Sequence, residues 1–528
     1  MKTMKLWKKI VMGIVSVLLA AAIVTLCVLF VPVRISAENS VFEKGWATDN
    51  NGYEINGPDV ERLISVRPTE LQTTFSDLGY YSFIHYGMNT FTGEEWGTGQ
   101  EDPSQFCPTN VDTDQWVRVL KESGSKGVIF TAKHHDGFCL WPSAYTEHSI
   151  KNSPYMDGKG DIVKQMADSC KKYGMKFGIY LSPWDMHEET YGTDAYNDYF
   201  VNQLTELCTH YGELFTIWFD GAKGEDAPDF TYDFDRYYQV IRELQPNCAI
   251  SNQGPDVRWI GNEAGIARES EWSVISKGSE SAEAIEARSQ KGEDQADQLQ
   301  SVAYDAEDVG SREVVLQYKN LIFKPAEADV SIRPGWFYHA DQDDQVKSVE
   351  KLCDMYYKNV GGNSFLLLNV PPNQEGVIAE PDVEALRAFG EQIAHDFSKP
   401  VQNVCLTVGS AAEMHADGQA DAILTDGSYM MKDGEYILDL DFDGEKEISR
   451  VVLKEDISYS QRVEAFDVYA KVNGKYQKLE ECTVIGSQKI CRLDQNLKNP
   501  SKAEGIRIVI RQSRSNPVLR SIQLYEKP

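Results

Sequence analysis

The sequence predicts an α/β protein, in which a (β/α)8-like TIM barrel is followed by a C-terminal all-β sandwich. Over residues 67–399, short apolar runs alternate with segments of helical spacing, as in parallel strands joined by crossover helices. Polar residues gather directly after these runs, which is expected at the carboxyl ends of barrel strands. From residue 400 the chain consists of short alternating segments separated by turns, which is typical of a sandwich.

Six apolar runs are predicted strands of the barrel. The clearest lies in the segment LFTIWFDG, where a run apolar enough for burial on both faces is followed directly by one carboxylate. The two remaining strands are expected in the irregular stretch Trp272–Tyr338, which includes the charged segment Lys277–Glu307, predicted to be a surface loop or insertion. A doubly wound open sheet is the alternative fold, but no GxGxxG motif follows the first strand. The six runs are Tyr80–Tyr86, Val128–Ala132, Lys176–Leu181, Leu214–Gly221, Cys248–Ser251 and Phe365–Val370.

Predicted helices separate the barrel strands. Glycine follows the first three of them, and Pro246 follows the fourth, as helix stop signals do. The helices are expected at Val111–Ser123, Asp161–Tyr173, Asp194–His210, Asp233–Leu244, Gln345–Asn359 and Asp382–Phe397.

Five alternating segments form the predicted sandwich of residues 400–528. Such a domain either binds sugar or braces the barrel, and bracing is favoured because no residue in it stands out as a ligand. Cys482 and Cys491 could bridge a hairpin there, although the ten scattered cysteines give little information about compartment. The segments are Glu435–Leu440, Ile448–Lys454, Ala465–Val472, Gly505–Ile510 and Leu519–Leu524.

The first 37 residues read as a signal peptide or an N-terminal membrane anchor, followed by a linker over residues 38–66. Four lysines precede an uncharged apolar run over about residues 10–33, which is long enough to span a bilayer. Either reading places the rest of the chain outside the cell, secreted or anchored at the surface, and limits membrane contact to an uncleaved segment. The net charge of −29, from 52 basic and 81 acidic residues, excludes a nucleic-acid partner.

Polar groups at the predicted strand ends suit a sugar-cleaving site. In a barrel they project to one mouth, where aromatic faces cover sugar C–H groups and polar groups bind hydroxyls. Asp220 and Glu263 would supply the two carboxylates that glycoside cleavage needs. A nucleophile must be ionised, so Asp220 should accept hydrogen bonds, whereas an acid/base needs the less polar surroundings that Trp259 could give Glu263. The gathered groups are His85, Glu95, Trp96, His134, His135, Tyr180, Trp218, Asp220 and Arg258–Glu263.

The adjacent His134 and His135 also permit two other interpretations. A metal-dependent hydrolase would use both as ligands, but neighbouring strand residues point to opposite faces unless the backbone turns. No HxH or HExxH motif accompanies them, and we predict neither a metal nor a cofactor. Alternatively, both are core histidines with backbone partners.

Several long motifs in matching order resemble the α-L-fucosidases of glycoside hydrolase family 29. The resemblance covers about residues 68–397 and implies an (α/β)8-like barrel, a following sandwich and a retaining double displacement. The motifs are Phe83–Gly97, Thr131–Ser143, Lys176–Asp185, Ile217–Ala222, Gly254–Glu263, Trp336–His339 and Gly361–Pro372.

The resemblance also implies residue roles. Asp220 matches the nucleophile that forms a fucosyl-enzyme, and Glu263 matches the acid/base of the branch that acts on α-1,3/1,4-linked fucose in Lewis-type glycans. Glu269 and Glu271 compete for the second role. Further matches are the fucose-hydroxyl ligands His85, His134 and His135, and the pocket residues Tyr180, Trp218, Glu95, Trp96 and Arg258.

The expected partners are fucosylated oligosaccharides or glycoconjugates. A retaining glycosidase for another monosaccharide, such as α-galactose, and a non-catalytic fucose-binding protein remain alternatives. The presence of both carboxylates speaks against the second. The loop after Asp220 is short, and residues 277–334 match no family motif.

Overall fold

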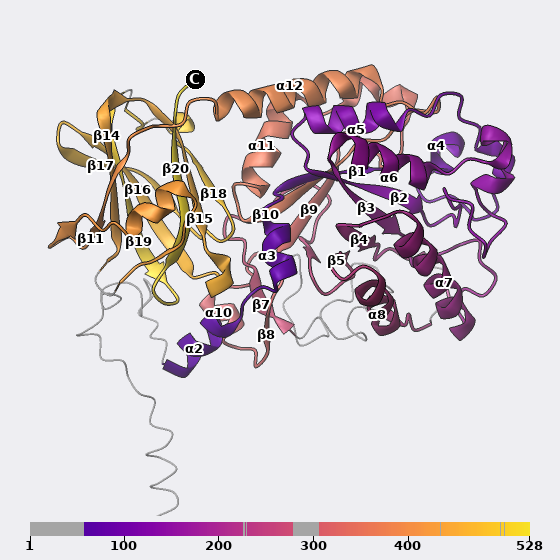
Figure 1. Ribbon diagram of the computed structural model, residues 1–528, viewed down its shortest axis with the longest axis horizontal. Coiled ribbons are helices and arrows are strands. Elements are labelled where there is room, and N and C mark those ends of the chain that lie inside the picture. The colour runs from indigo at the N-terminus through magenta and orange to yellow at the C-terminus, as the bar shows by residue number, and fades with distance from the viewer. Residues whose placement is uncertain are drawn as a thin grey trace, which may run out of the picture.

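The computed structural model describes residues 57–528 except 225, 226, 229, 278–305, 433, 434, 497 and 501. The predicted signal or anchor segment and most of Lys277–Glu307 lie outside the described residues. A barrel and a sandwich lie side by side, and α12 (Glu380–Asp396) runs from one toward the other (Figure 1). Gly57–Ser65, within the expected linker, forms helix α2. No described helix has the length and apolar character needed to cross a membrane.

Eight parallel strands form a nearly closed barrel in the order β5-β4-β3-β2-β1-β10-β9-β6. A bridge between Ser251 and Val257 joins its two edge regions. This confirms the predicted barrel over the doubly wound sheet, and each of the six predicted runs overlaps a strand. The strands are β1 (Tyr80–Ile84), β2 (Gly127–Lys133), β3 (Lys176–Leu181), β4 (Thr216–Phe219), β5 (Ala249–Asn252), β6 (Arg258–Trp259), β9 (Ala326–Ser331) and β10 (Ser364–Asn369).

The last two barrel strands differ in part from the prediction. β9 lies within Trp272–Tyr338 as expected, but the other strand is β6, further upstream. Two residues are too few to produce an apolar run that a sequence pattern can reveal. The remaining strands of that stretch, β7 (Val274–Ser276) and β8 (Leu321–Phe323), pair antiparallel in a separate sheet.

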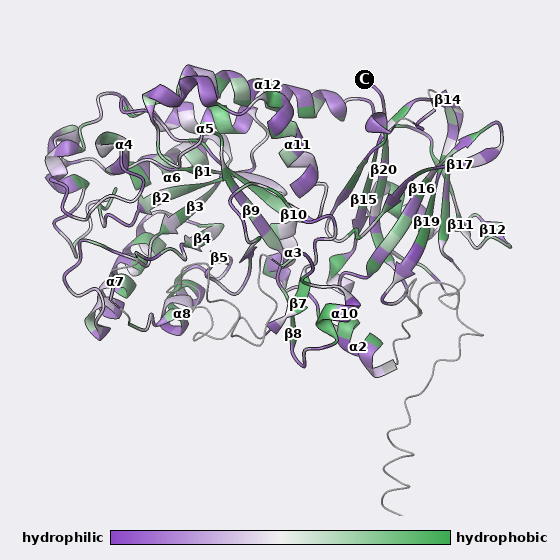
Figure 2. Cartoon of the chain, turned by 180° about the vertical axis from the view of Figure 1, so that it is seen from behind, coloured by the Kyte–Doolittle hydropathy of each residue, from purple (hydrophilic) through white to green (hydrophobic). Residues whose placement is uncertain are grey.

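Three of the outer helices are capped by aspartates, and the outer helices bury an apolar face on the barrel. Asp112, Asp161 and Asp233 each accept a hydrogen bond from a backbone N–H of the first helical turn, which stabilises the helix start. Viewed from behind, the strands that these helices cover are largely apolar (Figure 2). The helices are α5 (Thr113–Glu122), α6 (Ile162–Tyr173), α7 (Asp194–His210), α8 (Phe234–Leu244), α11 (Val349–Asn359) and α12, with the shorter α3 (Glu70–Ser76), α4 (Asn89–Thr92) and α10 (Arg312–Val315).

The C-terminal region consists of a six-stranded and a four-stranded antiparallel sheet, as predicted. The first contains β11 (Cys405–Gly409), β12 (Met414–His415), β14 (Ile437–Lys446), β16 (Val463–Val472), β17 (Lys475–Cys482) and β19 (Ala503–Ser513). The second contains β13 (Tyr429–Met430), β15 (Ile448–Glu455), β18 (Lys489–Arg492) and β20 (Val518–Glu526).

The four-stranded sheet packs against the barrel helices, in agreement with the bracing interpretation. Arg450 of β15 pairs with Asp396 of α12 at 3.0 Å, and Tyr357 of α11 lies in an apolar cluster with Val452 and Ile490. Arg450 also pairs with Asp494 at 2.5 Å, so its largely buried charge is balanced from both domains.

The expected hairpin pairing of Cys482 and Cys491 is wrong. These cysteines lie on β17 and β18, in different sheets. Their sulfurs face one another across the sandwich core at 3.6 Å.

Candidate active site

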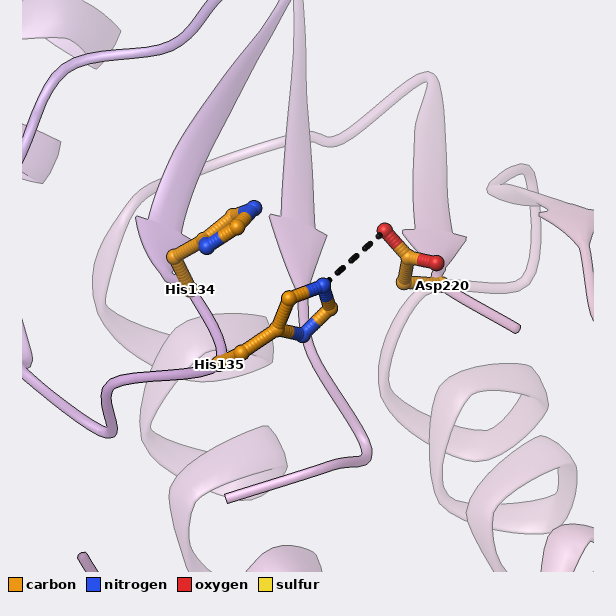
Figure 3. A group of neighbouring side chains, drawn as sticks. All are labelled: His134, His135 and Asp220. Atoms are coloured by element: carbon orange, nitrogen blue, oxygen red, sulfur yellow. Dashed lines mark ion pairs between the residues drawn. The ribbon is translucent and has the colours of Figure 1, made fainter. Parts of the chain in front are cut away.

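The predicted nucleophile and two predicted hydroxyl ligands meet at the carboxyl ends of the barrel strands. His134 and His135 follow β2, and Asp220 follows β4 (Figure 3). His135 Nε2 lies 3.8 Å from Asp220 Oδ2. Because the backbone turns after Lys133, both imidazoles reach the same site, and possible ligand atoms of all three residues lie within 4.8 Å of one another. The sequence objection to a shared ligand therefore does not hold, and the metal-free site stays a prediction.

Asp220 accepts the hydrogen bonds expected of an ionised nucleophile. The Tyr180 hydroxyl donates to Oδ2 at 2.8 Å, and the backbone N–H of Ala222 donates to Oδ1 at 2.8 Å. Hydrogen bonds to an ionised acceptor are stronger than those between neutral groups. The side chain is 21% exposed, so the carboxylate is held in place and still open to the mouth.

The three histidines are neutral at neutral pH. Burial lowers the pKa of His85 to about 4 and the pKa of His134 well below its usual value. Burial also lowers the pKa of His135, although the charge of Asp220 opposes this. A neutral imidazole offers one N–H donor and one acceptor, which are the groups that a sugar hydroxyl needs.

The hydrogen-bond partners of the ring nitrogens show whether His85 and His135 present a donor or an acceptor to a ligand. Ser182 Oγ donates to the Trp184 carbonyl oxygen at 2.6 Å, so it accepts from His135 Nδ1–H at 2.7 Å. His85 Nδ1–H donates to Asn369 Oδ1 at 2.9 Å. Both residues therefore present an unprotonated Nε2, which accepts a hydrogen bond from a hydroxyl.

Aromatic rings surround this polar group. The Tyr180 ring stacks on His134 and Trp218, with centroids 5.5 and 5.4 Å apart. Trp96 is 49% exposed and its edge contacts Trp184, with centroids at 5.3 Å. Exposed aromatic faces beside hydrogen-bonding groups suit a carbohydrate.

Glu95 ties one loop of the mouth to another through its carboxylate. Its carboxylate accepts from His339 Nε2 at 2.9 Å and from the backbone N–H of Trp336 at 2.8 Å. The Glu95–Trp96 segment is thus tied to the Trp336–His339 motif. The structure brings Glu95 to the predicted site, in a supporting position.

Burial distinguishes one of the three candidates for the acid/base from the other two. Glu271 is fully buried and pairs with Arg258 and with Arg268, the latter at 2.9 Å. Glu263 and Glu269 are both exposed, and the backbone carbonyl oxygen of Glu269 accepts a hydrogen bond from Thr483 of the sandwich at 2.7 Å. The preference for Glu263 over Glu269 therefore stays a prediction.

Arg258 is held by partners that follow β6. Its side chain is fully buried, and it pairs with Glu271 and donates to the Trp272 carbonyl oxygen at 3.0 Å. Neighbouring strand residues face opposite ways, and Trp259 contacts Asp329 of β9. The guanidinium therefore stabilises the segment after β6, and its role as a pocket residue stays a prediction.

Comparisons with known proteins decide the family. A family model described as alpha-L-fucosidase matches residues 61–396. The chain belongs to the alpha-L-fucosidase family. This fucosidase is 37% identical to alpha-L-fucosidase 1 of Arabidopsis thaliana over 454 residues, 84% of each chain.

Solved structures agree with this assignment. The fucosidase shares 38% identity and a TM-score of 0.71 with a glycoside hydrolase 29 family member from an unknown rumen bacterium, over 88% of its own chain and 78% of the other. A Ruminococcus gnavus GH29 fucosidase in complex with fucose gives 29% identity and a TM-score of 0.73, covering 88% and 95% of the chains. The protein is therefore a glycoside hydrolase.

Sequence reasoning missed three residues that support the site of the fucosidase. Asn369 holds His85 through its amide and itself donates to the Trp336 carbonyl oxygen at 2.8 Å. Glu327 and Asp329 are buried inside the barrel on β9. The alternation of acidic and small residues in AEADVS was the available signal, since it matches a strand with one polar inner face.

Proposed function

We propose that this fucosidase is a retaining exo-enzyme that removes terminal α-1,3/1,4-linked L-fucose from glycans. Asp220 carries the proposal: it is an accessible carboxylate held by two donors beside three neutral imidazoles. Its oxygen attacks the anomeric carbon and forms a glycosyl ester. The bond from that carbon to the leaving oxygen breaks, and Glu263 donates its proton to this oxygen. Glu263 then takes a proton from the water that hydrolyses the ester.

The histidines orient the sugar for this attack. His85 and His135 present acceptors to fucose hydroxyls. The Asn89 amide nitrogen donates to the Glu95 carbonyl oxygen and lies 3.4 Å from His134 Nδ1. Nδ1 of His134 is therefore the acceptor of this ring, and its Nε2–H is left as a donor. Hydroxyls both donate and accept, so this arrangement binds them without a charged group. Neutral imidazoles also leave Asp220 as the charged partner for the developing oxocarbenium ion.

The linkage and the location of the enzyme are proposals from the sequence. The GNE motif that contains Glu263 resembles the branch that acts on α-1,3/1,4-linked fucose, and the exposed position of Glu263 leaves room for a branched leaving group. The lysine-flanked apolar segment at the N-terminus favours a secreted or surface-anchored enzyme that meets fucosylated glycoconjugates outside the cell.

Chemical rescue tests the acid/base and the retaining mechanism together. On nitrophenyl α-L-fucoside, Glu263→Ala should lose activity and regain it with azide, yielding a fucosyl azide of inverted configuration relative to the fucosyl-enzyme, because a small anion replaces the base in the second step. Proton NMR of the wild-type product should show the α-anomer first.

The neighbouring Glu269→Ala variant is the matched control, since it removes a carboxylate from the same loop. It should keep activity near the wild-type value and gain nothing from azide. Rescue of Glu269→Ala in place of Glu263→Ala would move the acid/base to that residue, and a β-anomeric first product would contradict retention.

A further inference from the structure

The residues that lie between the two sandwich cysteines contact the barrel. Residues 483–490 are called the docking loop below. The Thr483 hydroxyl donates to the Glu269 carbonyl oxygen at 2.7 Å, in the segment that follows β6. The backbone N–H of Ser487 donates to Asn363 Oδ1 at 2.7 Å, directly before β10. The docking loop is therefore bonded to two segments of the barrel chain that are far apart in sequence.

Two further contacts fix the path of the docking loop. The backbone N–H of Ile490 donates to the Gly361 carbonyl oxygen at 3.0 Å. Gly486 has a φ of +62° and packs so closely on Asn363 that an added Cβ would clash with the amide, so this position favours glycine. The Asn363 amide also donates to the Glu271 carbonyl oxygen at 2.9 Å. The loop and the two barrel segments thus form one connected unit.

The docking loop begins and ends at two cysteines whose sulfurs face each other. Cys482 is the last residue of β17 and Cys491 lies in β18, and each strand stands at the end of the strand order of its sheet. The two Sγ atoms are 3.6 Å apart, and the residues are 4% and 1% exposed. A disulfide holds its sulfurs about 2 Å apart. The remaining gap is small enough for rotation of the side chains to close it.

The Glu480 carboxylate gives the cysteine pair a second interpretation. One of its oxygens and the two sulfurs lie within 4.8 Å of one another, as ligands of a metal ion would. A structural zinc site takes four ligands, whereas this group supplies three among the described residues. Both cysteines also belong to the apolar core of the sandwich, together with Leu479 and Ile485. A disulfide carries no charge, so these surroundings favour it over a cation.

We propose that Cys482 and Cys491 form a disulfide that joins the two sheets of the sandwich, closes the docking loop and stabilises the domain. The inference is independent of the roles proposed for Asp220 and Glu263. The bond runs between two sheets and not across a hairpin, and it encloses the residues that hold the barrel. Such a cross-link stabilises a fold because it restricts the unfolded chain.

The bond forms by thiol–disulfide exchange with a small disulfide such as oxidised glutathione. One cysteine thiolate attacks the oxidant and displaces a glutathione thiolate, and the second then attacks the mixed disulfide and displaces the other. The cysteines lose two protons and two electrons, and the oxidant becomes two thiols. In the folded chain the hydrogen bond with Cys491 and burial raise the pKa of the Cys482 thiol well above its usual value. Exchange therefore belongs to folding, before the sheets close.

Peptide mapping of the full chain tests the bond directly. Cell-free synthesis in a glutathione redox buffer and in dithiothreitol gives an oxidised and a reduced preparation. Activity on nitrophenyl α-L-fucoside shows that both are folded, and N-ethylmaleimide then caps free thiols in denaturant. Trypsin cuts after Lys478, Lys489 and Arg492, so the cysteines fall on peptides 479–489 and 490–492.

We expect these two peptides as one linked species in the oxidised preparation, separated by a reductant, and as two capped peptides in the reduced one. Two capped peptides from an active oxidised preparation would overturn the proposal. A bond from either peptide to a different cysteine would overturn it as well.

Melting temperatures measure the contribution of the bond to stability. The reduced preparation should melt about 5 °C below the oxidised one, and Cys482→Ala should abolish this difference. Cys170→Ala, which removes a buried thiol of α6 in the barrel, is the matched control and should keep the difference. Equal melting temperatures of the two wild-type preparations would contradict a stabilising bond.

Metal analysis distinguishes the interpretation that includes Glu480. Zinc sulfate is added during synthesis of the oxidised preparation, and bound zinc is measured after gel filtration. We expect the linked peptide and no zinc that depends on Cys482. One zinc ion per chain, lost in Cys482→Ala and accompanied by two capped cysteines in the wild type, would assign the sulfurs to a metal site and reject the disulfide.

Discussion

The two sides of the barrel mouth hold their titratable groups in opposite ways. The nucleophile side, made of His85, His134, His135, Tyr180 and Asp220 after β1 to β4, surrounds one carboxylate with neutral donors and acceptors. The acid side, made of Trp259, Glu263, Glu327 and Asp329, gathers three carboxyls around β6 and β9. One side favours a lasting negative charge, whereas the other favours a retained proton.

This difference is what the proposed double displacement needs from two carboxylates. The same chemical group must be ionised in one place and protonated in the other, and only its surroundings can separate the two states. Asp220 has a hydroxyl and a backbone N–H as donors. Asp329 has one indole N–H and two carboxyl neighbours. Burial is the main cause of the raised pKa of Asp329, and the two neighbouring carboxyls raise this pKa further.

Removing the charged group of the nucleophile side should give the largest effect. Asp220→Ala has no oxygen to attack the anomeric carbon, so kcat on nitrophenyl α-L-fucoside should fall at least about 10⁴-fold. Asp168→Ala, which removes an exposed carboxylate paired with Lys164 on α6, should stay within about twofold of wild type. Comparable activity in both variants would show that Asp220 forms no covalent bond, and the contrast between the two sides would lose its function.

Glu327 allows the acid side to be tested through the pH dependence of the free energy of unfolding. Burial raises its pKa to about 7 from an ordinary 4.5, against the hydrogen bonds from Tyr81 and Trp218. Between these two pKa values the folded form keeps a proton that the unfolded chain has lost. The contribution of this carboxyl to the free energy of unfolding is therefore fully present below pH 4.5 and is lost as the pH rises through about 7. The difference corresponds to about 3 kcal/mol.

Glu327→Gln removes this titration. We expect the free energy of unfolding in urea to decrease between pH 4.5 and 7.5 in both proteins. The decrease should be about 3 kcal/mol smaller in Glu327→Gln than in wild type. Asp112, a helix cap of α5 on the outer wall, gives Asp112→Asn as a matched control that keeps most of the wild-type slope. Equal slopes in wild type and Glu327→Gln would mean that the carboxyl is ionised within the barrel, and the acid side would not favour retained protons.

The two sides also differ in how far the sequence predicts them. On the nucleophile side each catalytic or ligand residue directly follows a long apolar run, so a strand end could be placed from residue spacing, and the structure brings His85, His134, His135 and Asp220 together. On the acid side β6 has two residues, and the strand of Glu327 and Asp329 alternates polar with small residues. No apolar run marks either strand.

Arg258 shows why proximity in sequence is a weak guide on that side. It lies five residues before Glu263 and carries a charge that would suit a sugar. The direction of its side chain, however, depends on which face of the sheet its position in the strand takes. That face is set by the pairing of β6 with β9, which joins Arg258 to Ala326, 68 positions further along the chain. A side chain that is oriented by such a long-range pair can be placed only after the barrel is closed.

Removing one hydroxyl of the nucleophile side should give the smallest effect and the sharpest comparison. Tyr180→Phe loses the donor to Asp220 Oδ2 but keeps the ring stacked between His134 and Trp218. A hydrogen bond to a charged group is worth about 1.5–3 kcal/mol, so kcat/KM should fall about 10- to 100-fold with little change in melting temperature. Tyr155→Phe, whose hydroxyl contacts Gln165 on the outer wall, removes the same atom without touching the mouth and should leave kcat/KM unchanged. A loss of less than about threefold in Tyr180→Phe would mean that the backbone N–H alone holds the charge, and the nucleophile side would then owe its character to its loop and not to its tyrosine.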